Sequence, residues 1–289
     1  MPELPEVEVV KRSLTRKTQN LIVKAIKIND GRLRYKIDRK KIKKIIGLKF
    51  KKISRRSKYL LFFFNQNVVM LVHLGMTGKF FFVDYKRTKH KTSFYYDLNE
   101  NKDKKHDRVI FDLSNNQKLI YNDVRKFGFI KFIKQVNLDQ NVHHKYLGPE
   151  PLSVKFNFRY FKNYVKEKER TIKDILMDQK FISGLGNIYV NEILFFSGVR
   201  PTKKIKKLTN FEIQKIIKYS KKIISKAIIH GGSSIKNFSS SSGKKGSFQQ
   251  HFSVYGKKGE NCPRVKCKGN IKKIIIANRA SFYCARCQK

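Results

Sequence analysis

The feature that most restricts the fold of this chain is the spacing of its four cysteines. All four fall in the last 28 residues, and they are Cys262, Cys267, Cys284 and Cys287. The pattern C-x4-C, sixteen residues, C-x2-C places two thiolate pairs on two tight turns, and such pairs complete one tetrahedral zinc shell. Disulfides are the alternative, and a reducing compartment argues against them. Between the pairs, KKIIIANRASFYC predicts a β-hairpin with Arg279 near its second arm.

The chain is strongly basic. It has 66 Lys and Arg against 21 Asp and Glu in 289 residues, a formal net charge of +45. Clustered Lys and Arg gain free energy by displacing the counterions condensed on phosphates, so this charge indicates a polyanionic partner. The richness in Ile, Asn, Phe and Tyr is also typical of an AT-rich genome, in which many lysines are solvated residues without a ligand. Charge alone does not distinguish a nucleic acid from an anionic surface.

No stretch of the sequence predicts a membrane span. The most apolar one, YLLFFFNQNVVMLVHLG, is broken by Asn65, Gln66 and Asn67 and is too short for a spanning helix. The acidic start lacks the basic and apolar segments of a signal peptide. We therefore expect a soluble, cytoplasmic protein.

The sequence opens with a predicted helix. Val7, Val10 and Leu14 recur at helical spacing after two prolines, which are tolerated in a first helical turn. Glu3 and Glu6 at this end complement the helix dipole, which explains them without a role in any site.

A sheet-rich region and a linker come next. From about 21 to 132, short β-branched and aromatic runs alternate with turn signals, which predicts a sheet-rich domain. The stretch 141–153, NVHHKYLGPEPLS, predicts a linker because Gly148, Pro149 and Pro151 interrupt regular structure.

The following region is predicted to be helical. Its clearest helix begins at Thr209, where TNFE is a capping box, and stops at Gly231. The core-facing stripe of this helix consists of Ile213, Ile216, Ile217, Ile223 and Ile224. Upstream, GLGNIYV places a two-glycine turn before another helix, where Asn187 either packs or binds a phosphate. The Ser- and Gly-rich GGSSIKNFSSSSGKKGSF predicts a flexible linker.

Seven stretches of the chain match one family in order. They are MPELPEVE at the start, RRSKYLLF at 55–62, HLGMTG at 73–78, NDVRKFG at 122–128, GLGNIYVNEILF at 184–195, VYGKKGENC at 254–262 and RASFYCARCQK at the end. Together they resemble the bacterial formamidopyrimidine-DNA glycosylases, and such a set is far more specific than any single motif.

The resemblance implies an α+β fold: a two-layered β-sandwich with an N-terminal helix, a helix-two-turn-helix domain and a zinc β-ribbon. The implied divisions are a catalytic domain at 1–135, a linker at 136–152, the helical domain at 153–232, a lid loop over the flipped base at 233–252 and the ribbon at 253–289. The implied activity is base-excision repair of double-stranded DNA, with removal of 8-oxoguanine and formamidopyrimidines followed by β,δ-elimination. One structural Zn²⁺ per chain, a monomer and association with the nucleoid through DNA are expected as well.

The same resemblance explains the opening MPELPEVE chemically. Proline after Met1 permits removal of the initiator methionine, which leaves Pro2 as a free secondary amine. An α-amino group has a pKa near ~7.7 to 8.0, so on the order of a tenth is neutral and nucleophilic at neutral pH. Attack by Pro2 at the sugar C1′ expels the base, and the resulting iminium acidifies the adjacent carbon for strand cleavage.

Other roles are carried over from the family. Glu3 is the acid that opens the sugar, Lys58 the proton donor for β-elimination and Arg279 that for δ-elimination, although an arginine that stays protonated is expected mainly to clamp phosphate. Glu6 supports the site. The residues that contact DNA are Met76, His106, Arg125, Phe127, Lys168 and Asn187, of which Met76, Arg125 and Phe127 fill the space left by the flipped base.

Three departures from the family pattern bear on these roles. The first cysteine pair is separated by four residues where many relatives have two, Val124 and Lys126 stand where relatives often have Pro and Arg, and the loop at 84–106 is long. Two alternatives remain: an endonuclease VIII-like glycosylase for oxidised pyrimidines, and a non-catalytic zinc-ribbon DNA-binding protein. LPEVE and RKF argue against the first, and Pro2, Glu3 and Lys58 argue against the second.

Overall fold

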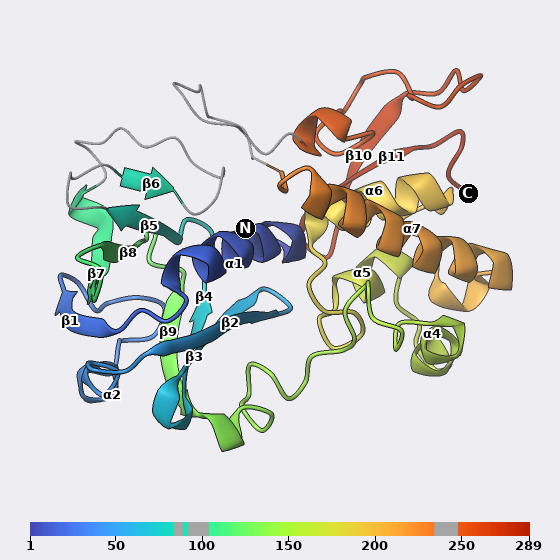
Figure 1. Ribbon diagram of the computed structural model, residues 1–289. Helices are drawn as coiled ribbons and strands as arrows, with labels where there is room; N and C mark the ends of the chain where they lie inside the picture. The colour runs from blue at the N-terminus through green and yellow to red at the C-terminus, as the bar shows by residue number, and fades with distance from the viewer. Residues whose placement is uncertain (84–88, 92–103, 234–247) are drawn as a thin grey trace. The chain divides into compact units, whose positions relative to one another are not determined.

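The computed structural model describes residues 1–83, 89–91, 104–233 and 248–289 (Figure 1). The chain divides into two compact units. The first unit comprises Met1–Lys145 and 231–233, and the second comprises Tyr146–His230 and Phe248–Lys289. Most of the long loop at 84–106 and most of the predicted lid at 233–252 lie outside the described residues.

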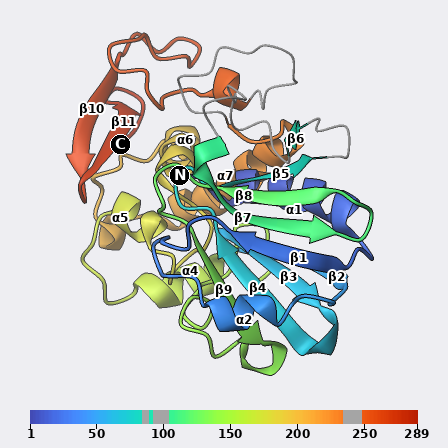
Figure 2. The same cartoon turned by 90° about the vertical axis from the view of Figure 1, so that its left-hand side faces the viewer.

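The first unit contains two antiparallel sheets, which form two layers (Figure 2). The five-stranded sheet has the order β1-β7-β8-β5-β6, and the four-stranded sheet has the order β2-β3-β4-β9. The strands are β1 Val23–Ile28, β2 Phe50–Arg56, β3 Tyr59–Phe64, β4 Val68–His73, β5 Lys79–Val83, β6 Lys89–Lys91, β7 Asp107–Leu113, β8 Lys118–Asn122 and β9 Phe129–Lys134. The sheet-rich prediction for 21–132 is confirmed.

Strand β3 shows how the sequence places the four-stranded sheet between two apolar layers. In YLLFFF, Leu60 and Phe62 point into the core shared with the other sheet, whereas Leu61 and Phe63 belong to a second cluster on the opposite face. Alternate residues of a strand point to opposite faces, so a strand with two buried faces is apolar throughout. The rings of Phe62 and Phe80 lie 5.5 Å apart between centroids and join the two sheets.

The N-terminal helix is α1, Leu4–Thr18, and it packs against β2 and β3 (Figure 1). Val7, Val10 and Leu14 are buried as their spacing predicts. A short helix, α2, spans Arg39–Lys43 and begins at the N-cap Asp38.

The second unit is helical with a terminal β-hairpin. Its helices are α4 Phe158–Val165, α5 Ile172–Met177, α6 Asn187–Ser197 and α7 Asn210–Ile229, and its hairpin consists of β10 Ile271–Ile276 and β11 Arg279–Cys284. Thr209 caps α7 in a capping box with Glu212, as predicted. Of the predicted stripe, Ile217 is only half-buried. No helix of the described residues is long and apolar enough to cross a membrane.

The stretch predicted as a linker has no helix or strand, but its second half is packed. Gly148 N donates to Gln179 O at 2.9 Å, and Ser183 Oγ donates to Gly148 O at 2.8 Å. Ser183 N also donates to Pro149 O at 2.9 Å. This part of the chain therefore belongs structurally to the second unit.

A buried carboxylate holds the segment before the cysteines against α6. Glu192 accepts hydrogen bonds from the backbone N–H groups of Ser253, Val254 and Tyr255 at 2.8, 3.0 and 2.9 Å. Burial raises the pKa of Glu192, and these donors oppose that effect. Irregular backbone needs such partners because its N–H groups are not paired within a helix or a sheet.

We predict that Glu192→Gln loosens this segment. The amide of Gln has one oxygen and an NH2 group that only donates, so at least one of the three N–H groups loses its acceptor at a cost of about 2 kcal/mol. Amide exchange at Val254 and Tyr255 is then expected to be about thirtyfold faster. The matched control is Glu260→Gln at an exposed carboxylate, with exchange within about twofold of wild type. Equal exchange in Glu192→Gln and wild type would contradict the prediction.

Candidate active site and cysteine cluster

The first turn of α1 is closed by two buried glutamates. Glu3 is the N-cap and forms a capping box with Glu6, in which Glu3 N donates to Glu6 Oε2 at 2.8 Å. The other oxygen of Glu6 accepts from Ser233 N at 2.9 Å and Ser233 Oγ at 3.1 Å. Glu3 is 3 % exposed and Glu6 is fully buried, and Pro2 before them is buried too. Both glutamates lie at the helix N-terminus, where they complement the dipole as expected, but the alternative that Glu6 is an exposed surface acid is wrong.

Lys58 lies in the tight turn between β2 and β3 and is buried. The turn needs a left-handed residue, which is Ser57 with φ 55°. Arg55 ties it to α1, because its Nε donates to Glu8 Oε2 at 2.9 Å and its NH1 to Ser57 O at 3.0 Å. The sequence spacing gave no indication of this Arg55–Glu8 link.

His73 shows that the N-terminus and Lys58 are close in space. Burial, followed by the positive charges of Lys58 and Arg34 and, more weakly, of the N-terminal amine, lowers the pKa of His73 to about 4. Its Nδ1 accepts from Gly75 N at 3.0 Å, so the ring is neutral with its proton on Nε2. The structure thus brings the predicted nucleophile, acid and lysine into one region of the first unit.

Three predicted DNA-contacting residues lie on two adjoining loops of the first unit. Met76 lies between β4 and β5, while Arg125 and Phe127 lie between β8 and β9. Met76 and Phe127 are 39 % and 45 % exposed, which is high for large apolar side chains. The guanidinium of Arg125 lies 4.5 Å from the Phe127 ring centroid. The two loops touch at Gly75, because a Cβ at this position would lie only 2.4 Å from the backbone atoms of Phe127 and Gly128.

His106 is joined to the second of these loops. It lies just before β7, in a 3₁₀ turn at Lys104–His106, and its carbonyl accepts from Asp123 N at 3.1 Å. Its Nδ1 is 3.2 Å from NH2 of Arg108.

In the second unit, the residues around Arg279 are held by a buried lysine that the sequence analysis missed. Arg279 begins β11 and is exposed. The next carbonyl, Ala280 O, accepts from Asn187 Nδ2 at 3.0 Å and from Lys173 Nζ at 2.9 Å, and Lys173 also donates to Ser281 Oγ at 2.6 Å. Asn187 and Arg279 are therefore brought together. Lys173 carried no signal because its partners lie more than 100 positions away.

Lys168 follows α4 and is half-buried, with its Nζ 4.8 Å from the ring centroid of Tyr164. It thus contacts a tyrosine of its own segment.

The four cysteines converge as their spacing predicts. All four Sγ atoms lie within 4.8 Å of one another. Cys262 Sγ and Cys287 Sγ are 3.7 Å apart, as are Cys267 Sγ and Cys284 Sγ. Thiolates at about 2.3 Å from a tetrahedral metal ion would be about 3.8 Å apart, so the cluster fits one metal ion. Gly269 is required beside it, because a Cβ there would lie 2.9 Å from Cys284 Sγ. Cysteines bonded as disulfides would lie far closer.

Comparison with known proteins agrees with this arrangement. A two-sheet domain with a capped N-terminal helix, followed by a helical domain and a cysteine ribbon, defines a DNA glycosylase of the helix-two-turn-helix class. The family models for the formamidopyrimidine-DNA glycosylase N-terminal domain and H2TH domain match residues 1–130 and 147–239. The chain belongs to the formamidopyrimidine-DNA glycosylase family.

Individual relatives extend over the full chain. The formamidopyrimidine-DNA glycosylase of Rickettsia bellii (strain OSU 85-389) is 38% identical over 289 residues, all of both chains, and that of Roseobacter denitrificans is 34% identical over the same length. Among solved structures, a Lactococcus lactis FPG mutant in complex with a Fapy-dG containing DNA has a TM-score of 0.85, 32% identity and full coverage of both chains. The Lactococcus lactis Fpg in complex with an abasic site containing DNA has a TM-score of 0.83, 32% identity and 99% coverage of each.

The environment of Lys173 predicts a pH-dependent stability. Burial, followed by the charge of Arg279, lowers the pKa of Lys173 from 10.5 to about 7. Between these values the unfolded chain binds a proton that the folded chain does not, so this lysine makes the free energy of unfolding rise as pH increases from 7 to 10.

Lys173→Met removes this dependence. The difference in free energy of unfolding, wild type minus Lys173→Met, is expected to increase by roughly 1 kcal/mol per pH unit between pH 7 and 10. Urea unfolding at several pH values measures it, and the subtraction cancels the other titrating groups. Parallel pH curves for the two proteins would show that Lys173 keeps an ordinary pKa.

Proposed function

We propose that this protein removes oxidised purines from double-stranded DNA and then cleaves the strand at the abasic site. The observation that carries the proposal is the buried N-terminus of α1, where Pro2 precedes the capping box of Glu3 and Glu6. Family membership and the lesion-containing DNA of the Lactococcus lactis structures support it. The net charge of +45 suits a polyanionic substrate.

Pro2 is the nucleophile in this proposal. Removal of Met1, which is 42 % exposed, leaves the Pro2 amine at the positive end of the α1 dipole. That end disfavours a cation, so it favours the neutral amine that attacks the sugar C1′. The bond to the base breaks as the new C–N bond forms, and the departing base takes up the amine proton. Breaking of the bond between C1′ and the ring oxygen then gives the iminium, which makes the neighbouring sugar carbon acidic.

Two further groups move protons. Glu3, next to the amine and buried, protonates the sugar oxygen as the ring opens. Lys58 lies in the rigid β2–β3 turn and serves the elimination step, since Arg55 and Glu8 fix that turn against α1. Neutral His73 beside them adds no competing charge.

The exposed loops recognise the damaged duplex. Met76 and Phe127 fill the space left by the flipped base, and Arg125 donates to the orphaned cytosine. His106 binds a neighbouring phosphate.

The second unit contributes phosphate contacts and a metal. The phosphates are bound by Lys168, Asn187 and Arg279. Asn187 and Lys173 both donate to the carbonyl of Ala280, the residue after Arg279, and these bonds hold Asn187 and Arg279 in place. The metal held by the four cysteines is one structural zinc, because four thiolates in a tetrahedral set are typical of zinc. When bound, zinc would hold the two cysteine turns together. The turns in turn fix the position of β11 and of Arg279 at its start.

The zinc proposal is tested by metal content. The purified protein is expected to contain one zinc per chain, and Cys284→Ser to lose most of it and bind DNA more weakly, with the circular dichroism of the sheets retained. Well under half an equivalent of zinc in protein prepared without chelator would refute the assignment.

Borohydride trapping tests the nucleophile. With abasic or 8-oxoguanine DNA, reduction of the iminium is expected to give a covalent complex whose cross-link maps to Pro2, in a protein whose mass lacks Met1. Two matched variants sharpen the test. A variant that keeps an N-terminal extension should bind DNA but trap none, and Glu3→Gln should lose base excision at least tenfold more than cleavage of preformed abasic sites. Trapping that survives the extension would refute the role of Pro2.

A further inference from the structure

The loop at 123–128, which carries Arg125 and Phe127, is fixed at its base by one buried carboxylate. Asp123 is fully buried, and its Oδ1 accepts from Thr77 Oγ1 at 2.5 Å while its Oδ2 accepts from Gly128 N at 2.8 Å. Thr77 Oγ1 in turn accepts from Arg125 N at 3.0 Å. These bonds hold the ends of the loop, but they do not reach its tip.

The tip is Lys126, and it adopts an uncommon backbone conformation. Its φ is 58°, in the left-handed region that costs a residue with a Cβ about 1 kcal/mol. The side chains of Arg125 and Phe127 meet each other, whereas Lys126 between them extends to Asp30, with 2.7 Å between Lys126 Nζ and Asp30 Oδ2. The left-handed residue therefore separates the lysine from its two neighbours.

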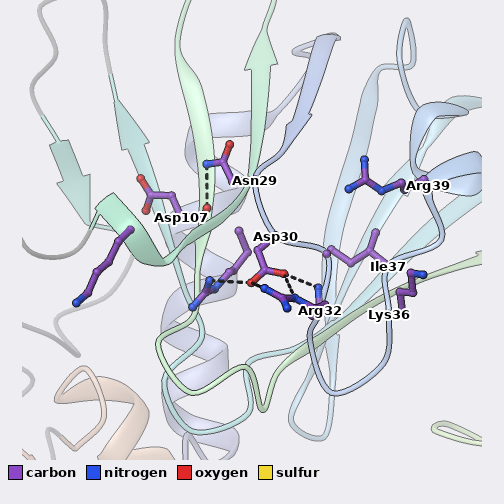
Figure 3. Close-up of a pocket in the computed structure, with 10 residues that line it drawn as sticks. Asn29, Asp30, Arg32, Lys36, Ile37, Arg39 and Asp107 are labelled. Atoms are coloured by element: carbon purple, nitrogen blue, oxygen red, sulfur yellow. Dashed lines mark hydrogen bonds and ion pairs between the residues drawn. The ribbon is translucent and has the colours of Figure 1, made fainter.

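Asp30 is itself held in place from several directions. Its Oδ1 accepts from Arg32 N and Arg32 Nε, both at 3.0 Å, and its Oδ2 lies 3.3 Å from Arg108 NH1 (Figure 3). Arg108 is buried and donates from Nε to Asp123 O at 2.9 Å, so the network returns to the base of the loop. The carboxylate lines a cavity of about 450 Å³. The hydrogen bond from Arg32, followed by that from Lys126, holds the pKa of Asp30 far below its usual range.

We infer that Asp30 is a positioning residue for lesion recognition: through Lys126 it holds the loop tip in the left-handed conformation that presents Arg125 and Phe127 to the duplex. The inference rests on the proposed function. Asp30 acts through Lys126 and touches no DNA. Without the carboxylate, Lys126 loses the contact that compensates its backbone conformation, and the tip samples other conformations. Insertion of Arg125 and Phe127 into the space left by the flipped base is then slower. Reaction with an abasic single strand needs no such insertion, because that strand has neither a base to flip nor an opposite base.

The test compares duplex and single-stranded substrates. Asp30→Asn keeps the side-chain volume and removes the charge. The kcat/KM of this variant for excision of 8-oxoguanine opposite cytosine is expected to fall about tenfold. Its rate of borohydride trapping on a single-stranded abasic oligonucleotide should fall less, so that the loss on the duplex is at least five times the loss on the single strand. The preference for cytosine over adenine opposite the lesion should narrow. A fluorescent base placed next to the orphaned cytosine should show a slower change in fluorescence as Arg125 and Phe127 insert.

Three further proteins decide the outcome. Lys126→Gln should reproduce the Asp30→Asn defect, and the double variant should be no worse than either single, because both remove one interaction. Asp38→Asn is the matched control, since this carboxylate on the same segment caps α2 through Lys40 N and should stay within twofold of wild type. Equal duplex and single-strand losses in Asp30→Asn, or additive losses in the double variant, would overturn the inference. Wild type that neither traps nor excises would instead refute the proposed function.

Discussion

The site of the first unit depends on the hydrogen bonds that the buried carboxylate of Glu6 accepts. One oxygen receives Glu3 N, and the other receives the backbone and side chain of Ser233. A buried carboxylate is stable only when its lone pairs are filled, so the first turn of α1 and the chain at 231–233 must both be in place. The position of Pro2 follows from this closure, because Pro2 directly precedes the N-cap Glu3.

Buried charged side chains that hydrogen-bond to backbone groups are also found at the other functional segments. Asp123, Glu192 and Lys173 are each almost fully buried. The two carboxylates accept from backbone N–H groups of irregular segments, and Lys173 donates to the Ala280 carbonyl at the start of β11. Backbone groups outside helices and sheets need partners, and a buried side chain supplies one in a single fixed position. The exposed side chains that these segments carry are therefore held on a rigid base.

Much of the architecture could be predicted from local pattern. The spacing of Val7, Val10 and Leu14 predicted α1, and the capping box at Thr209 predicted the start of α7, because helix periodicity and caps involve residues three or four apart. The cysteine spacing likewise predicted the cluster. Ile217 was assigned to the core and is half-buried, since periodicity does not say how wide the covered face is.

The sequence by itself determined the family, the helices α1, α6 and α7, the cysteine cluster and the identity of the candidate catalytic residues, because motifs and periodicity are local and ordered. Only the tertiary structure decided that Glu3 and Glu6 are buried, that Lys173 supports the strand of Arg279, and that Asp30 meets Lys126. Asp30 and Lys126 are 96 positions apart, and no pattern in either segment relates them. Such pairs form because the fold brings loops that are distant in sequence to one edge of the sheets, where opposite charges that are only partly exposed come within ion-pair distance.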